Sequence, residues 1–449
     1  MDYDTAALVQ ADLAHILHGN TNLYDYLNGQ GPVILAKGEG AIVTDTDGKE
    51  YIDGLAGLWN VSIGHGRKEI AEAAAEQIRQ IAYAPTMLSL SNVPAIKLAE
   101  KLAQITPEPI DRFFYACGGA EGNETAFKIV RYFNSVQNRK DKYKIISRQM
   151  AYHGLAQASM AATGLPVFWR HFGPPAPGFV HIAAPYCYRC AFGKTYGQCD
   201  LDCAMALEGA IQAEGEESVA AFIGEPVQGA GGVIVPPREY WPIIRDICTR
   251  YNVLLIADEV ITGFGRTGTY FGMQNWGVKP DLMTIAKGIT SAYLPLSAVG
   301  ISKAVFQGMA QPGAAFMHNY TYSGHPVSCA AALKNIEILE RENLVQHAAE
   351  MGLHLNERLA ELRDLPYVGE TRGLGLMAAI EFVADKKTKA RFEPQQKFGA
   401  QLTKLTRQDG LLSRAGDEWL ALAPPLVINR EQIDTAVEAI KSALLKISV

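Results

Sequence analysis

The middle of the chain alternates short apolar runs with longer amphipathic ones, and this alternation restricts the possible folds more than any other feature of the sequence. Four of the apolar runs have the length and composition of strands buried on both faces, and they span residues 144–147, 219–223, 253–257 and 282–286. An amphipathic stretch over 240–251 lies between two of them and predicts a helix. Strands that alternate with helices indicate βαβ units and a mostly parallel sheet.

The length of the chain, 449 residues, exceeds that of one ordinary domain. We expect residues 66–325 to form a large α/β domain. A long helical pattern follows Pro326 and continues through Arg358, and a mixture of short strands and helices follows it. Residues 1–65 and 326–449 are therefore expected to form a smaller α+β domain built from both ends of the chain.

The composition is that of an ordinary globular enzyme or binding protein, with 48% hydrophobic and 20% charged residues. A net charge of −6 favours neither nucleic acid nor an anionic membrane as a partner. The sequence has no apolar stretch of about 18 residues and no basic start typical of a secretion signal. Seven cysteines in so long a chain do not suggest a secreted disulfide scaffold, so we expect a cytoplasmic protein.

Polar and aromatic residues follow the predicted strands at the points where these end. Glu225 follows the run over 219–223, Asp258 follows 253–257, and Lys287 follows 282–286. Tyr152 and His153 come a short turn after the run over 144–147. Because ligands bind beyond the carboxyl ends of parallel strands, these side chains are candidates for one site.

The residue types suit pyridoxal 5′-phosphate (PLP). A lysine amine forms a Schiff base with an aldehyde, and a carboxylate beside the pyridine nitrogen keeps the ring able to accept electrons. Lys287 lies 29 positions after Asp258, which is the length of one crossover between neighbouring strands. A strand-end lysine taken alone is more often a solvated surface charge, and the matching positions of Asp258, Glu225 and Tyr152 argue against that alternative.

A glycine-rich turn, Cys117-Gly118-Gly119-Ala120, leads into a pattern of helical spacing. Such a turn presents free backbone N–H groups and the positive end of the helix dipole to a phosphate. A plain join between a loop and a helix is the alternative for this segment alone.

Taken together, these segments resemble the class III (omega) aminotransferases, a branch of the fold type I PLP enzymes. The strongest match is LLIADEVITGFGRTG…PDLMTIAKGI, supported by GGAEGNETAFKIVR, AYHG, GEPVQGAGG, TYSGHPVSCAAAL, GLGLM and APPLVI. The resemblance covers nearly the whole chain. It implies a large domain with a mostly parallel mixed sheet between helices and a smaller α+β domain.

The resemblance also implies roles for residues around the cofactor ring. Lys287 is the Schiff-base lysine and moves the proton, and Asp258 pairs with the pyridine nitrogen. Val260 packs on one face of the ring and Tyr152 on the other. Glu225, with His153 placed beside Tyr152, belongs to the surrounding network.

For the phosphate, the resemblance implies contacts from the backbone N–H groups of Gly119 and Ala120. Thr321 and the backbone of Tyr320 are implied to reach the phosphate of a second subunit, so the protein is expected to be a homodimer. The family commonly has Ser where this chain has Ala120. We expect this loss of a hydroxyl to weaken PLP retention without changing the reaction.

Within the family, the chain most resembles the omega-amine:pyruvate group, which implies a transaminase that moves an amino group from an amine to pyruvate by a ping-pong mechanism. Leu58 and Trp59 match substrate-pocket positions of that group. Arg414 matches an arginine that pairs with a substrate carboxylate and withdraws for apolar amines. The amine donor stays open, as does a relative that uses 2-oxoglutarate or works as an aminomutase or a decarboxylating aminotransferase.

Two other motifs point to different classes of protein. Residues 263–268 fit G-x-G-x-x-G and are followed by Asp281, as in nicotinamide-dependent oxidoreductases, but the glycines neither end a strand nor open a helix pattern. Four cysteines have a spacing compatible with a zinc site: Cys187, Cys190, Cys199 and Cys203. Reduced thiols in a surface loop are the simpler interpretation, so no metal is expected in the catalytic site.

Overall fold

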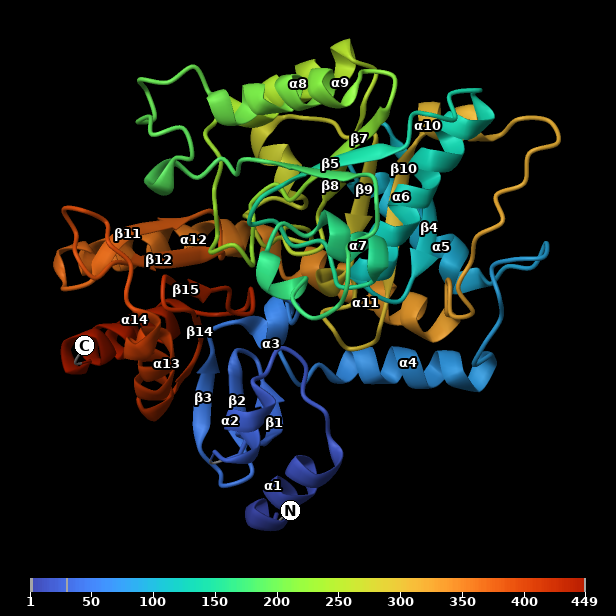
Figure 1. Cartoon of the computed structure of the whole chain (residues 1–449). Coiled ribbons are helices and arrows are strands. Elements are labelled where there is room, and N and C mark those ends of the chain that lie inside the picture. The colour runs from blue at the N-terminus through green and yellow to red at the C-terminus, as the bar shows by residue number, and fades with distance from the viewer. Residues whose placement is uncertain (1–2, 30, 448–449) are drawn as a thin grey trace.

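The computed structural model describes residues 3–29 and 31–447, and its centre is a seven-stranded sheet (Figure 1). Strand β10 (Ser297–Ser302) is antiparallel to both of its neighbours. The five strands that follow it across the sheet, from β9 (Leu282–Ile285) to β6 (Phe179–Ile182), run parallel to one another. The mostly parallel mixed sheet expected from the sequence is thus confirmed. In spatial order the strands are β4 (Ile110–Ala116), β10 (Ser297–Ser302), β9 (Leu282–Ile285), β8 (Leu254–Asp258), β7 (Val219–Gly224), β5 (Lys144–Arg148) and β6 (Phe179–Ile182).

Helices cover both faces of this sheet, which explains why its strands lack an alternating pattern. Along β7, Ile223 packs into the apolar cluster of helix α6 (Gly119–Val136), while Phe222 packs into the cluster of α9 (Tyr240–Arg250). All six residues of β7 are buried. Strands buried on both faces give continuous apolar runs. The remaining helices of this region are α7 (Gln157–Ala162), α8 (Asp202–Glu214) and α10 (Lys303–Met309).

The four strands and the helix predicted in the middle of the chain are confirmed within two residues at each end. The connection between β8 and β9 differs from a helical crossover. It consists of turns and a short 3₁₀ helix, η3 (Gly272–Trp276), and the glycines of the G-x-G-x-x-G motif lie in those turns. Since the motif opens no helix, the structure gives no support for dinucleotide binding there.

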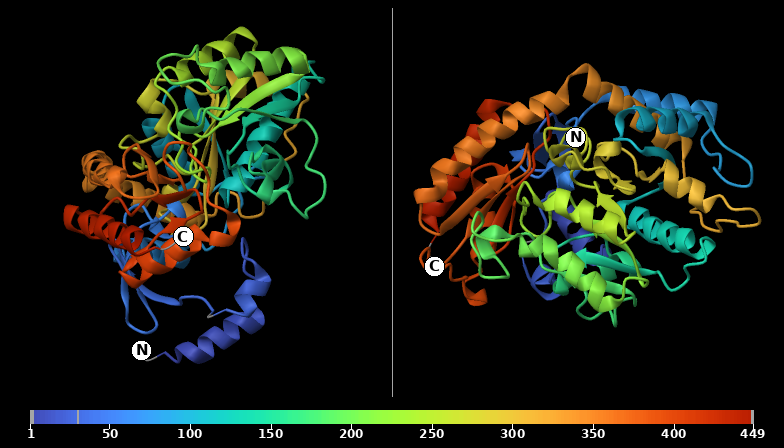
Figure 2. Two further views of the ribbon diagram at one scale, coloured as in Figure 1. Left: turned by 60° about the vertical axis from the view of Figure 1, so that its left-hand side comes forward. Right: turned by 90° about the horizontal axis from the view of Figure 1, so that it is seen from above.

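Segments from both ends of the chain pair with one another outside the large sheet (Figures 1 and 2). One sheet joins the N-terminal strands to β13 in the order β1 (Leu35–Glu39), β2 (Ile42–Asp45), β3 (Glu50–Asp53) and β13 (Leu411–Leu412). A second sheet is antiparallel and has the order β11 (Val368–Gly373), β12 (Ala378–Phe382), β15 (Trp419–Leu422) and β14 (Arg414–Ala415). The helices of this C-terminal part are α12 (Leu344–Ala360), α13 (Phe398–Gln408) and α14 (Arg430–Lys446).

The long helical pattern after Pro326 forms two helices rather than one. Helix α11 (Pro326–Arg341) ends just before Asn343, whose φ of 51° is left-handed and incompatible with a continuing helix. Helix α11 packs on two helices from earlier in the chain, α4 (Lys68–Gln80) and α5 (Val93–Ile105). The other helices near the N-terminus are α1 (Thr5–His15), α2 (Leu23–Leu27) and α3 (Ala56–Trp59). No helix among residues 3–29 and 31–447 is long and apolar enough to cross a membrane.

Two glycines inside helices test how closely helix α12 packs against the backbone at Gly375. A Cβ atom at Gly352 in α12 would lie 2.3 Å from the carbonyl carbon of Gly375, whereas one at Gly209 in α8 would meet nothing within 4 Å. We expect Gly352→Ala to destabilise the protein by about 1–3 kcal/mol, since the backbone must move. Gly209→Ala should be neutral or stabilise it by up to about 1 kcal/mol. Thermal unfolding measures both, and equal melting temperatures for the two variants would contradict the packing described.

Candidate active site

A cavity of about 340 Å³ lies at the carboxyl ends of the parallel strands. Strands β7, β8 and β9 all end at it, and the N-terminal turn of α6 closes one side. The structure brings most of the candidate residues to its lining: Gly119, Ala120, Tyr152, His153, Glu225, Asp258, Val260 and Lys287.

The carboxylate of Asp258 is fixed from both sides by hydrogen bonds. Its Oδ2 atom accepts a hydrogen bond of 2.8 Å from Asn123 Nδ2 and lies 2.7 Å from His153 Nδ1. Its Oδ1 atom accepts a hydrogen bond of 3.1 Å from the backbone N–H of Val260. The side chain of Asp258 is only 3% exposed, so this network replaces the water that would solvate it.

Sequence reasoning did not identify Asn123 as part of the site. Its side chain links the helix that begins at Gly119 to Asp258 on β8, and it also donates to the carbonyl oxygen of His153 at 2.8 Å. A usable signal was present, since Asn123 lies four residues after Gly119 and shares its face of the helix.

The backbone around Lys287 has a left-handed conformation that residues other than glycine rarely adopt. Lys287 has a φ of 48°, and Ser291 just after it has a φ of 49°. Asn335 of α11 donates hydrogen bonds of 2.8 and 3.0 Å to the carbonyl oxygens of Gly288 and Ile289, and Ser291 Oγ donates to Asn335 Oδ1 at 2.7 Å. These bonds stabilise the strained loop.

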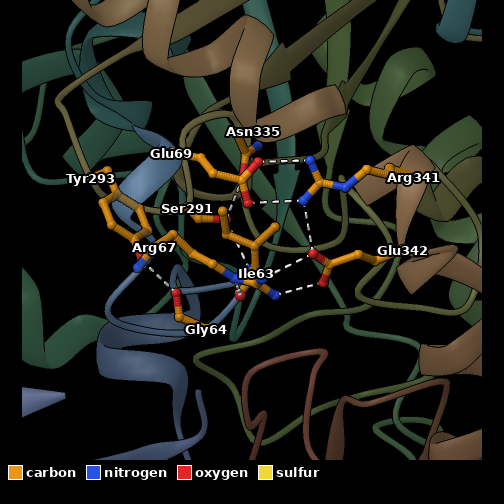
Figure 3. A network of polar contacts seen from close by, with 9 residues as sticks. All are labelled: Ile63, Gly64, Arg67, Glu69, Ser291, Tyr293, Asn335, Arg341 and Glu342. Atoms are coloured by element: carbon orange, nitrogen blue, oxygen red, sulfur yellow. Dashed lines mark hydrogen bonds and ion pairs between the residues drawn. The ribbon is translucent and has the colours of Figure 1, made fainter. Parts of the chain in front are cut away.

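A wider polar network ties this loop to the chain segment over 63–69 (Figure 3). The Tyr293 hydroxyl donates to the carbonyl oxygen of Gly64 at 2.7 Å and accepts from the N–H of Arg67 at 2.8 Å. The guanidinium of Arg67 then forms a bidentate ion pair with Glu342, at 2.9 and 2.7 Å, beyond the end of α11. The loop that carries Lys287 is therefore anchored by helix α11 and by the segment over 63–67, and the latter is held in turn by Glu342.

Burial lowers the pKa of the Lys287 amine to about 8, from an ordinary value of 10.5. Nearby carboxylates of Asp258 and Glu225 act in the opposite direction, and the cations Arg414 and Arg266 lower the pKa further. A lysine with such a pKa has a substantial neutral fraction near pH 8, so it can act as a nucleophile or a base.

Two buried glutamates stand behind the cavity. Burial raises the pKa of Glu225, which accepts hydrogen bonds from the N–H groups of Tyr152 at 3.0 Å and Gly229 at 2.9 Å. Burial also raises the pKa of Glu259 to about 7. Hydrogen bonds donated by Thr262 and by two backbone N–H groups act in the opposite direction and lower this pKa. Glu259 does not line the cavity; it ties the turn after β8 to η3, and sequence reasoning gave it no role.

The glycine turn at the start of α6 leaves room for a ligand. A Cβ atom at Gly118 would meet nothing within 4 Å, whereas one at Gly119 would lie 2.9 Å from Val260 Cγ1. Helix α6 has no side-chain cap on its first N–H groups, and its first turn lines the cavity, so the positive end of the helix dipole lies at the cavity. A helix end for a phosphate, a fixed carboxylate for a ring nitrogen and a lysine for an aldehyde together fit PLP.

Other candidate residues lie outside this lining. Thr321 is exposed, and its carbonyl oxygen accepts a hydrogen bond of 2.7 Å from the Tyr83 hydroxyl, while Tyr320 is half-buried beside Glu121. Leu58 is 54% exposed, and Trp59 is buried in an apolar cluster that includes a residue of the lining, Ile261.

Arg414 is close enough for its charge to lower the pKa of Lys287 and to act on Tyr152, although it is not part of the lining. The four cysteines considered for zinc line a separate small cavity and are free thiols: Cys187, Cys190, Cys199 and Cys203. In the described part of the chain, no group of three or more His, Cys, Asp or Glu residues is placed to hold a metal ion.

Comparison with known proteins identifies the class that this fold and site define. The family model of the class-III aminotransferases matches residues 25–444, and the chain belongs to this family. The enzymes of this family use PLP, which the cavity fits.

Several similar proteins are transaminases whose names state different oxo-acid acceptors. An (S)-enantioselective omega-transaminase from Thermomicrobium roseum is 50% identical with a TM-score of 0.97, over 100% of this chain and 99% of that one. A diaminobutyrate–2-oxoglutarate transaminase of Halomonas elongata is 44% identical over 98% of this chain and 96% of its own. A putrescine–pyruvate aminotransferase of Pseudomonas aeruginosa is 41% identical over 94% and 92%.

The lowered pKa of Lys287 predicts a pH dependence for cofactor uptake. Below about pH 8 the amine is mostly protonated and cannot attack an aldehyde, so the rate at which apoenzyme takes up PLP should rise about tenfold per pH unit and level off above about pH 8. Rates measured by absorbance are divided by those of N-acetyl-lysine with PLP, which removes the titration of PLP itself. Because the free amine has a pKa of about 10.4, the ratio should stay level below about pH 8 and fall about tenfold per pH unit between pH 8 and 10. A ratio that does not change between pH 6 and 10 would contradict the lowered pKa.

Proposed function

We propose that this protein transfers an amino group from a primary amine or omega-amino acid to an oxo acid, with pyruvate as the first candidate, by a ping-pong mechanism. The observation that carries this proposal is the convergence of Lys287, Asp258 and the N-terminal turn of α6 on one cavity. When bound, PLP supplies the electron sink that makes a proton next to the amine nitrogen removable.

The protein's own side chains divide the remaining work. Asp258, fixed by Asn123 and His153, would face the cofactor's ring nitrogen. Lys287 would hold the cofactor through its amine and, once freed by the amine substrate, would move the proton as a base and then as an acid. Val260 and Tyr152, which both line the cavity, would lie on opposite faces of the ring.

The N–H groups of Gly119 and Ala120, at the start of α6, would donate hydrogen bonds to the cofactor's phosphate. Ala120 supplies no hydroxyl there, and we expect weaker PLP retention as a result. Leu58 and Trp59 would shape the substrate pocket, and the apolar cluster around Trp59 extends to Ile261 on the cavity lining.

Arg414 is the group that would bind the carboxylate of the acceptor. No hydrogen bond or ion pair engages its guanidinium among residues 3–29 and 31–447, although its charge acts on Lys287 and Tyr152. An unengaged guanidinium beside the cavity can form a bidentate pair with pyruvate. The relatives named above use either pyruvate or 2-oxoglutarate, so 2-oxoglutarate is the second candidate acceptor.

We further propose a homodimer, in which Thr321 and Tyr320 reach the cofactor phosphate of the other subunit. The segment over 317–324 lies against 83–92 through hydrogen bonds. Each carries a strongly exposed apolar side chain, Met317 at 91% in the first segment and Leu88 at 87% in the second. Such a surface favours a protein partner. A cytoplasmic location agrees with the seven free thiols.

The test combines a substrate panel with a lysine variant. Alanine or glutamate formation from a set of amines, measured with pyruvate and with 2-oxoglutarate, identifies the acceptor, and we expect pyruvate to react faster. Lys287→Ala should lower turnover by about 10²–10⁴-fold or more, because the proton carrier is lost. Lys404→Ala, on the exposed face of α13, is the control and should react like the unchanged protein. Equal rates for the two variants would contradict the proposal.

A further inference from the structure

Arg414 lies on a β-hairpin whose geometry places one aromatic ring beneath it. In the sheet of β11, β12, β15 and β14, Arg414 pairs with Ala421 and the N–H of Gly416 bonds to the carbonyl oxygen of Trp419 at 2.7 Å. Residues opposite each other and residues two apart on a strand share a face of the sheet, so the side chains of Arg414 and Trp419 are diagonal neighbours. The guanidinium carbon lies 5.9 Å from the centre of the Trp419 ring (Figure 1 for the strands).

Within the described residues the ring is the one group that the Arg414 guanidinium contacts directly, since neither a hydrogen bond nor an ion pair holds it. A cation within about 6 Å of a tryptophan ring is attracted by the negative face of that ring. The contact has no hydrogen-bond geometry to satisfy, so the guanidinium can leave the ring without leaving a buried polar group unpaired.

The Trp419 ring itself is held firmly by groups that belong to different parts of the chain. A Cβ atom at Gly232, which has a φ of 102°, would lie 2.9 Å from Trp419 Cδ1, so the backbone of that loop passes directly against the indole. Arg372 fixes the same loop by donating to the carbonyl oxygens of Gly232 at 2.6 Å and Val233 at 3.0 Å.

Arg372 also anchors the strand next to Trp419. Glu381 pairs with Trp419 across β12 and β15, is fully buried, and accepts hydrogen bonds from Arg372 at 3.0 Å and Arg189 at 2.8 Å. The Tyr186 hydroxyl donates to it as well. The indole is therefore a rigid surface on which the Arg414 guanidinium rests.

We propose that Trp419 is a positioning residue that holds the Arg414 guanidinium ready for a substrate carboxylate. The inference rests on the proposed function of Arg414. A guanidinium confined to the ring face has fewer side-chain conformations to lose when it pairs with pyruvate, so its binding costs less entropy. An acceptor without a carboxylate gains nothing from this arrangement. Trp419 thus sets the preference for oxo acids over aldehydes.

The test compares two acceptors that differ in the carboxylate, pyruvate and propanal, with one amine donor and PLP-loaded enzyme. Trp419→Met, which removes the ring but retains much of its apolar bulk, should raise the KM for pyruvate by about 3–10-fold and leave that for propanal within twofold. Trp419→Phe, which keeps an aromatic face, should retain most of the pyruvate affinity. KM does not depend on the fraction of folded enzyme, so partial loss of the protein does not obscure the comparison.

Arg414→Met separates this inference from the proposed function. If Arg414→Met leaves the KM for pyruvate unchanged, the proposed carboxylate contact is wrong. If Arg414→Met raises it but Trp419→Met does not, or if Trp419→Met changes the KM for both acceptors equally, the positioning role of Trp419 is wrong. In the variant that lacks Arg414, adding Trp419→Met should have no further effect on pyruvate. Should Trp419→Met fail to fold, a loss in Trp419→Phe as large as that in Arg414→Met would equally overturn the inference.

Discussion

The register between β8 and β9 places the two groups on which the proposed chemistry depends. Asp258 pairs with Thr284 across these parallel strands, and the N–H of Glu259 continues the ladder to the carbonyl oxygen of Thr284 at 2.9 Å. Lys287 follows only three residues beyond that pair. A slip of one residue would turn Asp258 to the opposite face of the sheet, so the buried strands fix the carboxylate and the lysine together.

Burying this set of charges is unfavourable, and the surrounding structure compensates through fixed hydrogen bonds. Asn123 and His153 stabilise Asp258, while Asn335 and Ser291 stabilise the left-handed backbone at Lys287. At Lys287, burial has a larger effect than the neighbouring carboxylates and lowers the pKa of the amine to about 8. The same burial that is costly for folding therefore provides an amine that is reactive near neutral pH.

The sequence was sufficient to predict the large sheet, because its strands are buried on both faces and appear as continuous apolar runs. It was also sufficient for the residues at the strand ends, since topology brings all of these to one edge. Asn335 could not be identified, because its importance lies in contacts with residues far away in the chain. Asn123 was missed, although its spacing from Gly119 places it on the same face of the helix. The break at Asn343 was missed as well, since only the left-handed backbone there separates two helices of similar composition. The division into domains and the roles of individual residues remain predictions.

The most direct test is to reduce the PLP-loaded protein with borohydride and to map the modified peptide by mass spectrometry. Reduction converts a Schiff base into a stable secondary amine, so the cofactor stays attached to the lysine that held it. The structure predicts one modified residue, Lys287, with loss of the absorbance near ~420 nm that PLP bound in this way gives. A cofactor attached to any other lysine, or released without attachment, would contradict the account of the site.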